Sequence, residues 1–319
     1  MENKELINKI NREYDTLKFV AENKKNENIK IAYEKAPELK EIDEKINNSG
    51  FEMMRKIIAK PDEAVNLRNK LEEELKILKK QRDEIIKKHK IDKNYNKSVY
   101  MCEICSDTGY TENGRCKCFE ERIIKENAKN SNLGNMICDD GFEGFTLNWY
   151  EEKYKPIIKE AVLSTKQLCE DFNNTSYNLF FYGTTGLGKT YLSSIAANEV
   201  LKRGKSVQYV RAAKMFSDYE DYKFRDYSIK EYIESLYSCD LLVIDDLGSE
   251  STNKNDVAFL FDLMNERLIN NKKIIINTNL EISDFTKRYS VRLTSRIYES
   301  FKIFRFEGED IRILKLKNK

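Results

Sequence analysis

The pattern of apolar and polar residues divides the chain into two parts. In residues 1–95, apolar side chains recur every three or four positions among many charged ones, as at Leu6, Ile10 and Tyr14. This spacing predicts helices with one apolar face. Beyond a helix expected at 156–172, short apolar runs and helical patterns alternate to about residue 306. That alternation predicts a parallel α/β sheet with helices on both faces.

The N-terminal region, residues 1–95, is expected to form a helical hairpin or a small bundle. Asn47-Asn48-Ser49-Gly50 predicts a break between helices. The three prolines each precede a helical pattern, as prolines of a first turn do; they are Pro37, Pro61 and Pro156. Two roles remain open on pattern alone. The region is either a solvated structural extension or a module whose amphipathic helices bind a partner protein.

Residues 96–125 change character because a cluster of cysteines falls there. A C-x₂-C pair and a C-x-C pair are separated by turn residues. Four thiolates brought together in this way suit tetrahedral Zn²⁺, and so small a segment needs the metal to fold. The alternative is a chance cluster of free thiols. The predicted zinc ligands are Cys102, Cys105, Cys116 and Cys118. The remaining cysteines are interpreted as ordinary buried residues; they are Cys138, Cys169 and Cys239.

A glycine-rich segment after the apolar run 178–182 carries the strongest chemical signal. Its residues are Gly183, Thr184, Thr185, Gly186, Leu187, Gly188, Lys189 and Thr190, and a helical pattern follows. The order strand, glycine loop, helix is that of a P-loop, whose backbone N–H groups surround phosphate oxygens. Lys189 should then reach the β- and γ-phosphates of ATP, and the Thr190 hydroxyl should coordinate Mg²⁺. A chance match is the alternative, and the flanking elements count against it.

A second apolar run ends in two acids, Asp245 and Asp246. It predicts a buried parallel strand, and the carboxyl ends of such strands face the crevice where α/β sheets bind ligands. Asp245 suits the Walker B role of holding Mg²⁺, directly or through water, and Asp246 would polarise the attacking water. The alternative is a strand that ends in an Asx turn. The P-loop earlier in the chain favours the Walker B interpretation.

Further candidates for catalysis follow the second apolar run. A third strand-like run ends at Asn279, whose amide would orient the lytic water near the γ-phosphate; an Asn that ends a strand at a turn is the plainer alternative. Arg292 and Arg296 come after a predicted helix. An arginine supplied across a subunit boundary would stabilise transition-state charge on the transferred phosphoryl group. From the residues alone, a surface arginine pair is favoured.

Composition narrows the function classes. Of 319 residues, 40% are hydrophobic and 34% are charged, which suits two domains of which one has a large core. The formal net charge of +2 excludes a global electrostatic field for nucleic acid, so DNA contact needs a local site. The sequence begins with charged residues and contains no run of about 18 apolar residues. We therefore expect a cytoplasmic protein with no membrane partner.

One local segment combines cations with aromatic rings, as single-strand binders do. A tyrosine-rich helix packed on the sheet is the favoured alternative. The residues concerned are Lys214, Lys223, Arg225, Tyr219, Tyr222, Tyr227, Tyr232 and Tyr237.

Taken together, the motifs resemble a known family. The P-loop, Asp245-Asp246, Thr278-Asn279 and Arg292-x₃-Arg296 resemble the AAA+ ATPases, in particular the bacterial helicase loaders of the DnaC/DnaI type and the related IstB transposition ATPases. The segment 102–110 resembles the zinc segment ahead of the ATPase domain in some of these loaders. The segment 143–147 resembles the aromatic stretch that leads into that domain near the adenine.

The resemblance implies an AAA+ ATPase core at 178–319, preceded by a connector at 126–177 that includes the start of the ATPase domain. It implies weak ATP hydrolysis and head-to-tail self-association. In that arrangement Asn279 would be sensor 1. Arg296 would act in trans as an arginine finger, with Arg292 assisting. The N-terminal helices and zinc segment would bind the DnaB-type replicative DNA helicase, and the ATPase domains would contact single-stranded DNA. An ATP-dependent helicase loader in replication initiation or restart is the implied function.

The chain departs from the family pattern in two places. Asp246 stands where most AAA+ proteins have Glu, and its shorter side chain would slow hydrolysis; the helicase loaders resemble this chain there. The sequence ends at Lys319, too soon for a helical lid, so the lid is expected to be absent or reduced. Arg312 would then replace the sensor 2 arginine, or else belong to a basic tail. Two rival functions stay open: an IstB-like transposition helper ATPase, and a non-hydrolysing adaptor that binds zinc and ATP.

Overall fold

The computed structural model describes residues 4–59, 64–133, 141–223 and 229–317. The chain forms two compact units, Met1–Phe119 and Glu120–Lys319. The division falls inside helix α4 (Lys117–Asn130), so the cysteine segment belongs to the first unit. The predicted boundaries after residues 95, 125 and 177 stay predictions.

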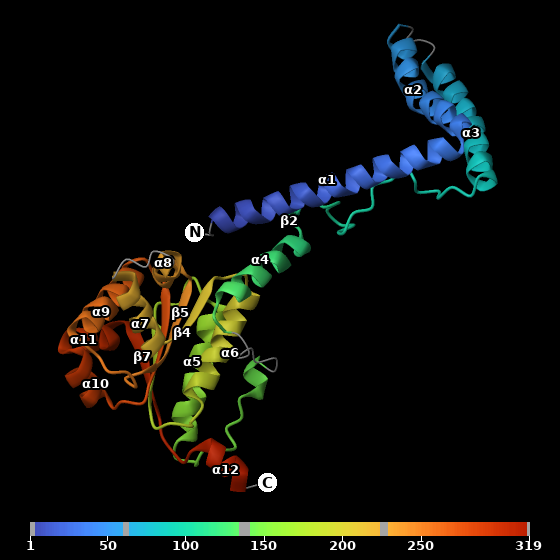
Figure 1. Ribbon diagram of the computed structural model, residues 1–319. Helices are drawn as coiled ribbons and strands as arrows, with labels where there is room; N and C mark the ends of the chain where they lie inside the picture. Colours follow the sequence, from blue (N-terminus) through green and yellow to red (C-terminus); the bar gives the residue numbers. More distant parts are fainter. Residues whose placement is uncertain (1–3, 60–63, 134–140, 224–228, 318–319) are drawn as a thin grey trace. The chain divides into compact units, whose positions relative to one another are not determined.

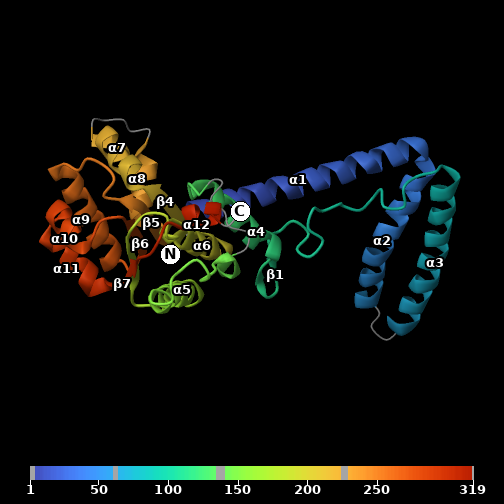
Figure 2. The same ribbon diagram turned by 90° about the horizontal axis from the view of Figure 1, so that it is seen from below.

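The first unit consists of three long helices and the cysteine segment (Figure 1). The helices are α1 (Lys4–Lys35), α2 (Pro37–Ala59) and α3 (Ala64–Lys88). A short hairpin of β1 (Tyr110–Thr111) and β2 (Gly114–Arg115) lies within the cysteine segment. Figures 1 and 2 both place α2 and α3 side by side, as the predicted helical hairpin requires. Pro37 begins α2 as expected, whereas Pro61 lies outside the described residues.

The break predicted at Asn47-Asn48-Ser49-Gly50 is wrong. These residues lie within α2, which continues to Ala59. Glycine and asparagine cost a helix only about 0.5–1 kcal/mol each. Side-chain packing along α3 outweighs a local preference of that size, because most helix stability in proteins comes from such packing.

A buried carboxylate, that of Asp43 in α2, links several segments of the first unit. Asp43 accepts hydrogen bonds from Arg82 Nε of α3 at 2.8 Å and from Tyr33 Oη of α1 at 3.0 Å. Tyr95, which follows α3, donates its hydroxyl to the same carboxylate. Burial, together with the Asp43 charge, raises the pKa of Tyr33 to about 12. The three helices therefore meet at one shared polar contact.

The second unit is built on a parallel sheet of five strands in the order β4-β5-β6-β3-β7. The strands are β3 (Asn178–Gly183), β4 (Val207–Arg211), β5 (Leu241–Leu247), β6 (Lys273–Thr278) and β7 (Phe301–Phe306). Because all five run the same way, their carboxyl ends share one edge of the sheet. In open α/β sheets, ligands bind at that edge.

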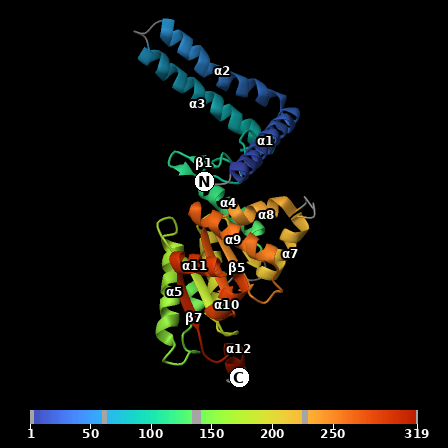
Figure 3. The same cartoon turned by 90° about the vertical axis from the view of Figure 1, so that its left-hand side faces the viewer.

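Alternating strand residues bury both faces of the sheet. Leu241 and Val243 of β5 join one core with α5 and α6, whereas Leu242 and Ile244 join a second core with the remaining large helices. Figures 1 and 3 show α5 and α7 on opposite sides of the strands. The helices are α5 (Lys155–Glu170), α6 (Lys189–Lys202), α7 (Ala212–Lys223), α8 (Lys230–Ser238), α9 (Lys254–Ile269), α10 (Ile282–Tyr289) and α11 (Val291–Ser300). The expected α/β class with helices on both faces is confirmed.

Two short helices complete the second unit. A 3₁₀ turn, η3 (Gly141–Gly144), precedes α5, and α12 (Ile311–Lys317) follows β7. Among the described residues, α12 is the last element, and none of its side chains is buried. No helix in the described part of the chain combines the length and apolar character that crossing a membrane requires.

The tyrosines of α7 and α8 pack against the second core, which supports the packing alternative to DNA binding. The Tyr219 ring stacks on Phe259 of α9 with centroids 3.7 Å apart. Tyr222, Tyr232 and Tyr237 lie against the same core. Tyr227 and Arg225 lie outside the described residues.

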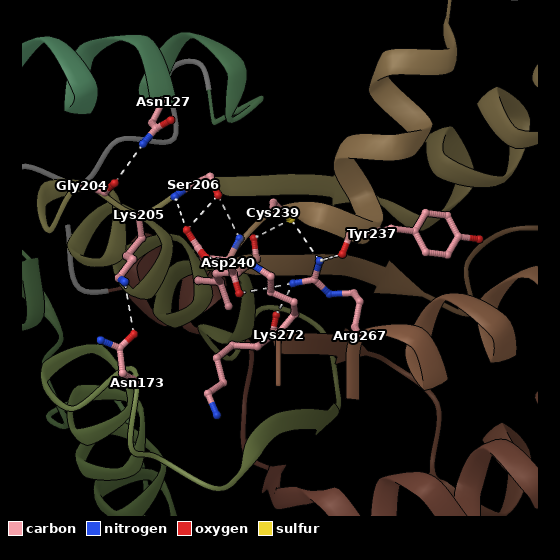
Figure 4. Close-up of polar contacts among 12 residues, drawn as sticks. Asn127, Asn173, Gly204, Lys205, Ser206, Tyr237, Cys239, Asp240, Arg267 and Lys272 are labelled. Atoms are coloured by element: carbon pink, nitrogen blue, oxygen red, sulfur yellow. Dashed lines mark hydrogen bonds and ion pairs between the residues drawn. The ribbon is translucent and has the colours of Figure 1, made fainter. Parts of the chain in front are cut away.

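A fully buried arginine, Arg267 of α9, stabilises the amino end of the sheet (Figure 4). Its guanidinium donates to the carbonyl of Leu236 at 2.6 Å and to that of Lys273 at 2.7 Å, which joins the end of α8 to the start of β6. It also donates to the thiol of Cys239 at 3.2 Å. Cys239 and Cys169 are buried as expected, and Cys138 lies outside the described residues.

Candidate functional site

The glycine-rich loop connects the end of β3 to the start of α6 at the carboxyl edge of the sheet. Two of its glycines are required by close contacts. Gly183 has φ of +116°, and a Cβ there would lie 2.1 Å from the carbonyl oxygen of Phe306. Gly186 has φ of +75°, and a Cβ there would lie 2.0 Å from Cγ of Asp310. A larger residue at either position would force the loop away from β7 or from the start of α12.

Lys189 is buried at the first position of α6. Its Nζ donates to the carbonyls of Gly183 and Thr184, each at 2.7 Å, so the loop folds around the ammonium group. Burial lowers the pKa of Lys189 to about 8, while the charges of Asp245 and Asp246 act in the opposite direction. A buried cation with only carbonyl partners is well suited to meet an anionic ligand.

The predicted magnesium ligands lie together. The Oδ1 atom of Asp245, at the end of β5, accepts a hydrogen bond from Thr190 Oγ1 at 3.0 Å. The same oxygen accepts one from Asn277 Nδ2 of β6 at 2.7 Å. A carboxylate and a hydroxyl in contact at a helix N-terminus form an oxygen donor set of the kind that Mg²⁺ uses beside substrate phosphates. The residues therefore fit the metal.

The predicted water-positioning residues also contact each other. Asp246, unlike Asp245, is exposed, and it has a left-handed backbone with φ of +58°. Asn279 donates from Nδ2 to Asp246 Oδ1 at 2.8 Å. The carboxyl ends of β5 and β6 thus present one buried and one exposed carboxylate, each held by an amide.

All of these side chains line one cleft of about 930 Å³, a volume typical of ligand sites. One wall is aromatic: the Phe145 ring stacks on Tyr191 at 6.0 Å and on Tyr150 at 6.3 Å. Tyr150 Oη donates to the carbonyl of Leu187 at 2.7 Å and so fixes that wall to the loop. The aromatic segment predicted near the adenine is therefore a wall of the cleft.

Several lining residues did not emerge from the sequence. Arg211 ends β4 beside Asp245 in the sheet register, and Lys315 of α12 reaches the same cleft. Arg312, which the sequence did suggest as a replacement for the sensor 2 arginine, also lines the cleft and is paired with Asp310 at 2.7 Å. Asn277 lies in β6, two positions before Asn279, which directly follows the strand. The signal that would have found Arg211 and Asn277 is a polar residue at the carboxyl end of a predicted parallel strand.

The two candidate arginines lie elsewhere. Arg292 and Arg296 are exposed on α11, and Arg296 Nη1 contacts Glu299 Oε2 at 2.8 Å. Neither belongs to the lining of the cleft in its own chain. Their use in trans stays a prediction.

In the first unit, the four predicted zinc ligands converge. Their sulfur atoms all lie within 4.8 Å of one another. The Sγ atoms of Cys102 and Cys116 are 3.8 Å apart, and those of Cys105 and Cys118 are 3.6 Å apart. A tetrahedral ion with Zn–S bonds of about 2.3 Å requires sulfur separations of about 3.8 Å. The cluster therefore has the size that Zn²⁺ needs.

Surrounding groups support this cluster. Asp107 accepts the backbone N–H groups of Met101 and Cys102 at 2.8 and 2.9 Å, which shapes the first turn. Tyr14 of α1 donates its hydroxyl to Cys118 Sγ at 3.0 Å, and its ring stacks on Phe119 at 5.6 Å. The first helix is thus in direct contact with the cysteine cluster, a contact that spacing along the sequence did not indicate.

Comparison with known proteins gives partial but consistent similarities. A family model for the IstB-like ATP binding protein matches residues 144–301. The chain is 28% identical over 138 residues to the replicative helicase loader DnaC of Escherichia coli (strain K12), which covers 43% of this chain and 56% of that protein. It is 34% identical over 141 residues to the chromosomal replication initiator protein DnaA of Campylobacter concisus (strain 13826), covering 44% and 32%.

Solved structures are also similar. The crystal structure of DnaI has a TM-score of 0.46 at 19% identity and covers 52% of this chain and 90% of that one. The crystal structure of the DnaC helicase loader has a TM-score of 0.46 at 20% identity, covering 53% and 97%. The match spans 56%, or about half, of the length of the DnaC protein of Escherichia coli.

The cysteine cluster predicts a measurable metal content. We expect about one Zn²⁺ per purified chain by mass spectrometry of metals, and Cys116→Ser should lose it because three thiolates bind the ion far less tightly than four. Cys169→Ser is the matched control, since that thiol is buried in the second unit. A Cys116→Ser protein that keeps its zinc would contradict the assignment.

The state of Lys189 predicts a proton linkage. With a pKa of about 8, about half of the nucleotide-free molecules carry a neutral amine at pH 8. A triphosphate beside the amine raises that pKa, so ATP binding should take up about half a proton at pH 8 and far less at about pH 7. Calorimetric titration in buffers of different ionisation enthalpy measures this uptake. A binding heat independent of buffer at pH 8 would argue against it.

Proposed function

We propose that the chain, whose residues 144–301 match the model of the IstB-like ATP binding protein, is an assembly-dependent ATPase that loads a replicative DNA helicase onto single-stranded DNA. The observation that carries the ATPase part is the convergence of Lys189 with the Thr190–Asp245 and Asp246–Asn279 contacts in one cleft. The similarity to DnaC, a protein named as a replicative helicase loader, supports the loading part.

In the proposed phosphoryl transfer, the residues of the cleft have different roles. Lys189 and the loop N–H groups would bind the triphosphate, and Thr190 and Asp245 would hold Mg²⁺, which would supply neutralisation of the phosphate charge. Asp246, fixed by Asn279, accepts a hydrogen bond from the attacking water and orients it. Since Asp is shorter than Glu, we infer slow basal turnover.

A second copy of the chain completes this site. Arg296, with Arg292 beside it, is exposed on α11 and outside its own cleft, so it is available to a neighbouring cleft. A guanidinium next to the γ-phosphate stabilises the charge of the transition state. Turnover then depends on head-to-tail assembly, and the nucleotide state controls how protomers pack.

The first unit is proposed to bind the helicase. Around the cysteine cluster, Val99, Met101 and Ile104 are 70%, 79% and 75% exposed. Apolar side chains gathered on one small, rigid segment are typical of protein-binding surfaces. Binding of Zn²⁺ by the four cysteines would keep that segment folded. The ATPase domains are proposed to contact the single strand.

Two other functions remain candidates. The IstB-like match favours a transposition helper that binds duplex DNA. A non-hydrolysing adaptor would use the same cleft for structural ATP. The cysteine segment and the three-helix region in front of the ATPase domain favour the loader, because they provide a separate partner-binding unit.

The trans arrangement predicts complementation between two inactive variants. Lys189→Ala should abolish ATP binding, whereas Arg296→Ala should bind ATP normally and lose turnover by about 10³-fold, the scale of an arginine finger. Mixing the two should restore part of the ATPase activity, because the first supplies Arg296 to the intact pocket of the second. Arg203→Ala, which removes an exposed ion pair with Glu199, is the control for charge loss. Equal loss of nucleotide affinity in both variants, or no recovery on mixing, would rule out the shared site.

The loader function predicts a stable complex with the cognate replicative helicase. We expect co-purification of the full chain with the helicase and loss of the complex when residues 1–95 are deleted. The deleted protein should still bind ATP, which separates partner binding from the ATPase unit. Retention of duplex DNA instead of the helicase would favour the transposition helper.

A further inference from the structure

One side chain of the cleft, Asn277, contacts Asp245 but is given no part in the phosphoryl transfer proposed above. It belongs to β6, pairs with Phe181 in the sheet register, and is 1% exposed. It nonetheless belongs to the lining of the cleft. An amide buried at a ligand site is costly unless its polar atoms are used.

The nitrogen of Asn277 is fully used. Nδ2 donates to Asp245 Oδ1 at 2.7 Å and to Ser193 Oγ of α6 at 2.7 Å. This orientation of the amide is fixed by chemistry, because an ionised carboxylate only accepts hydrogen bonds and the opposite flip would place two oxygens in contact. Asn277 therefore holds the carboxylate of Asp245 in place from behind.

The oxygen of Asn277 is not used. Oδ1 is buried and has no hydrogen-bond partner among the described residues. A buried acceptor of this kind calls for a donor that the protein itself does not provide, such as a water molecule. Magnesium keeps several of its waters when it binds beside phosphates, and those waters are donors.

From these contacts we infer that Asn277 is a positioning residue for the magnesium site: its nitrogen orients Asp245, and its oxygen accepts a hydrogen bond from the hydration shell of the metal. The inference rests on the proposed ATPase function. It explains why an amide, rather than an apolar residue, occupies a buried strand position between Asp245 and Ser193. Asn279, two residues later, serves the other carboxylate, Asp246.

The test compares nucleotide affinity with and without magnesium in the full-length protein. The probe is a non-hydrolysable ATP analogue, titrated in Mg²⁺ and in EDTA. The wild type should bind more tightly with Mg²⁺, and Asn277→Leu, which has a similar shape and no polar atoms, should lose about 10-fold or more of that enhancement while its affinity in EDTA is unchanged. Asn277→Ala should do the same and serves if the leucine variant does not fold.

Two matched variants separate positioning from simple structural support. Ser193→Ala removes the other partner of the same amide and should keep the magnesium enhancement. Asn279→Leu should keep the enhancement as well and lose turnover instead. An unchanged enhancement in Asn277→Leu and Asn277→Ala, or an equal loss in Ser193→Ala, would overturn the inference. A wild type that binds no nucleotide would overturn the ATP site itself, and this inference with it.

Discussion

A buried carboxylate cannot remain charged without hydrogen-bond donors, and the cleft is arranged around this requirement at Asp245. Thr190 at the start of α6 and Asn277 in β6 both donate to one oxygen of that side chain. These contacts join the loop helix to two neighbouring strands at the edge where their carboxyl ends meet. The geometry of the cleft therefore depends on the contacts of the Asp245 carboxylate, and the sheet supports the loop and the aromatic wall.

Much of this site could be predicted because its chemistry is local in the sequence. The P-loop is a continuous segment between a strand and a helix, so its glycines and Lys189 were identified directly. Asp245 and Asn279 each follow an apolar run, and parallel strands bring such residues to one edge. The cysteine spacing likewise indicated a cluster of four thiols, which the structure brings within 4.8 Å. The alternating pattern gave the correct sheet class and helix layers.

The contacts that the sequence did not reveal join residues far apart in the chain. Tyr14 and Cys118 are separated by 104 positions, and Asp43 and Tyr95 by 52. Spacing rules for helices and strands carry no information about such pairs. The error at Asn47–Gly50 has the opposite origin, since a local turn preference was overruled by packing against α3. The sequence did not indicate a role for Asn277, because an Asn near the end of a strand-like run is equally typical of the turn that follows the strand.

The first unit has a mechanical property that follows from Asp43. That carboxylate joins α1, α2 and α3 near the C-terminal end of α1, and Tyr14, about a third of the way along the same helix, contacts the cysteine cluster. Between Tyr14 and Tyr33 the helix is uninterrupted, and at about 1.5 Å per residue this stretch is roughly 28 Å long. The continuous backbone hydrogen bonding of α1 therefore links the polar contact at Asp43 directly to the cysteine cluster.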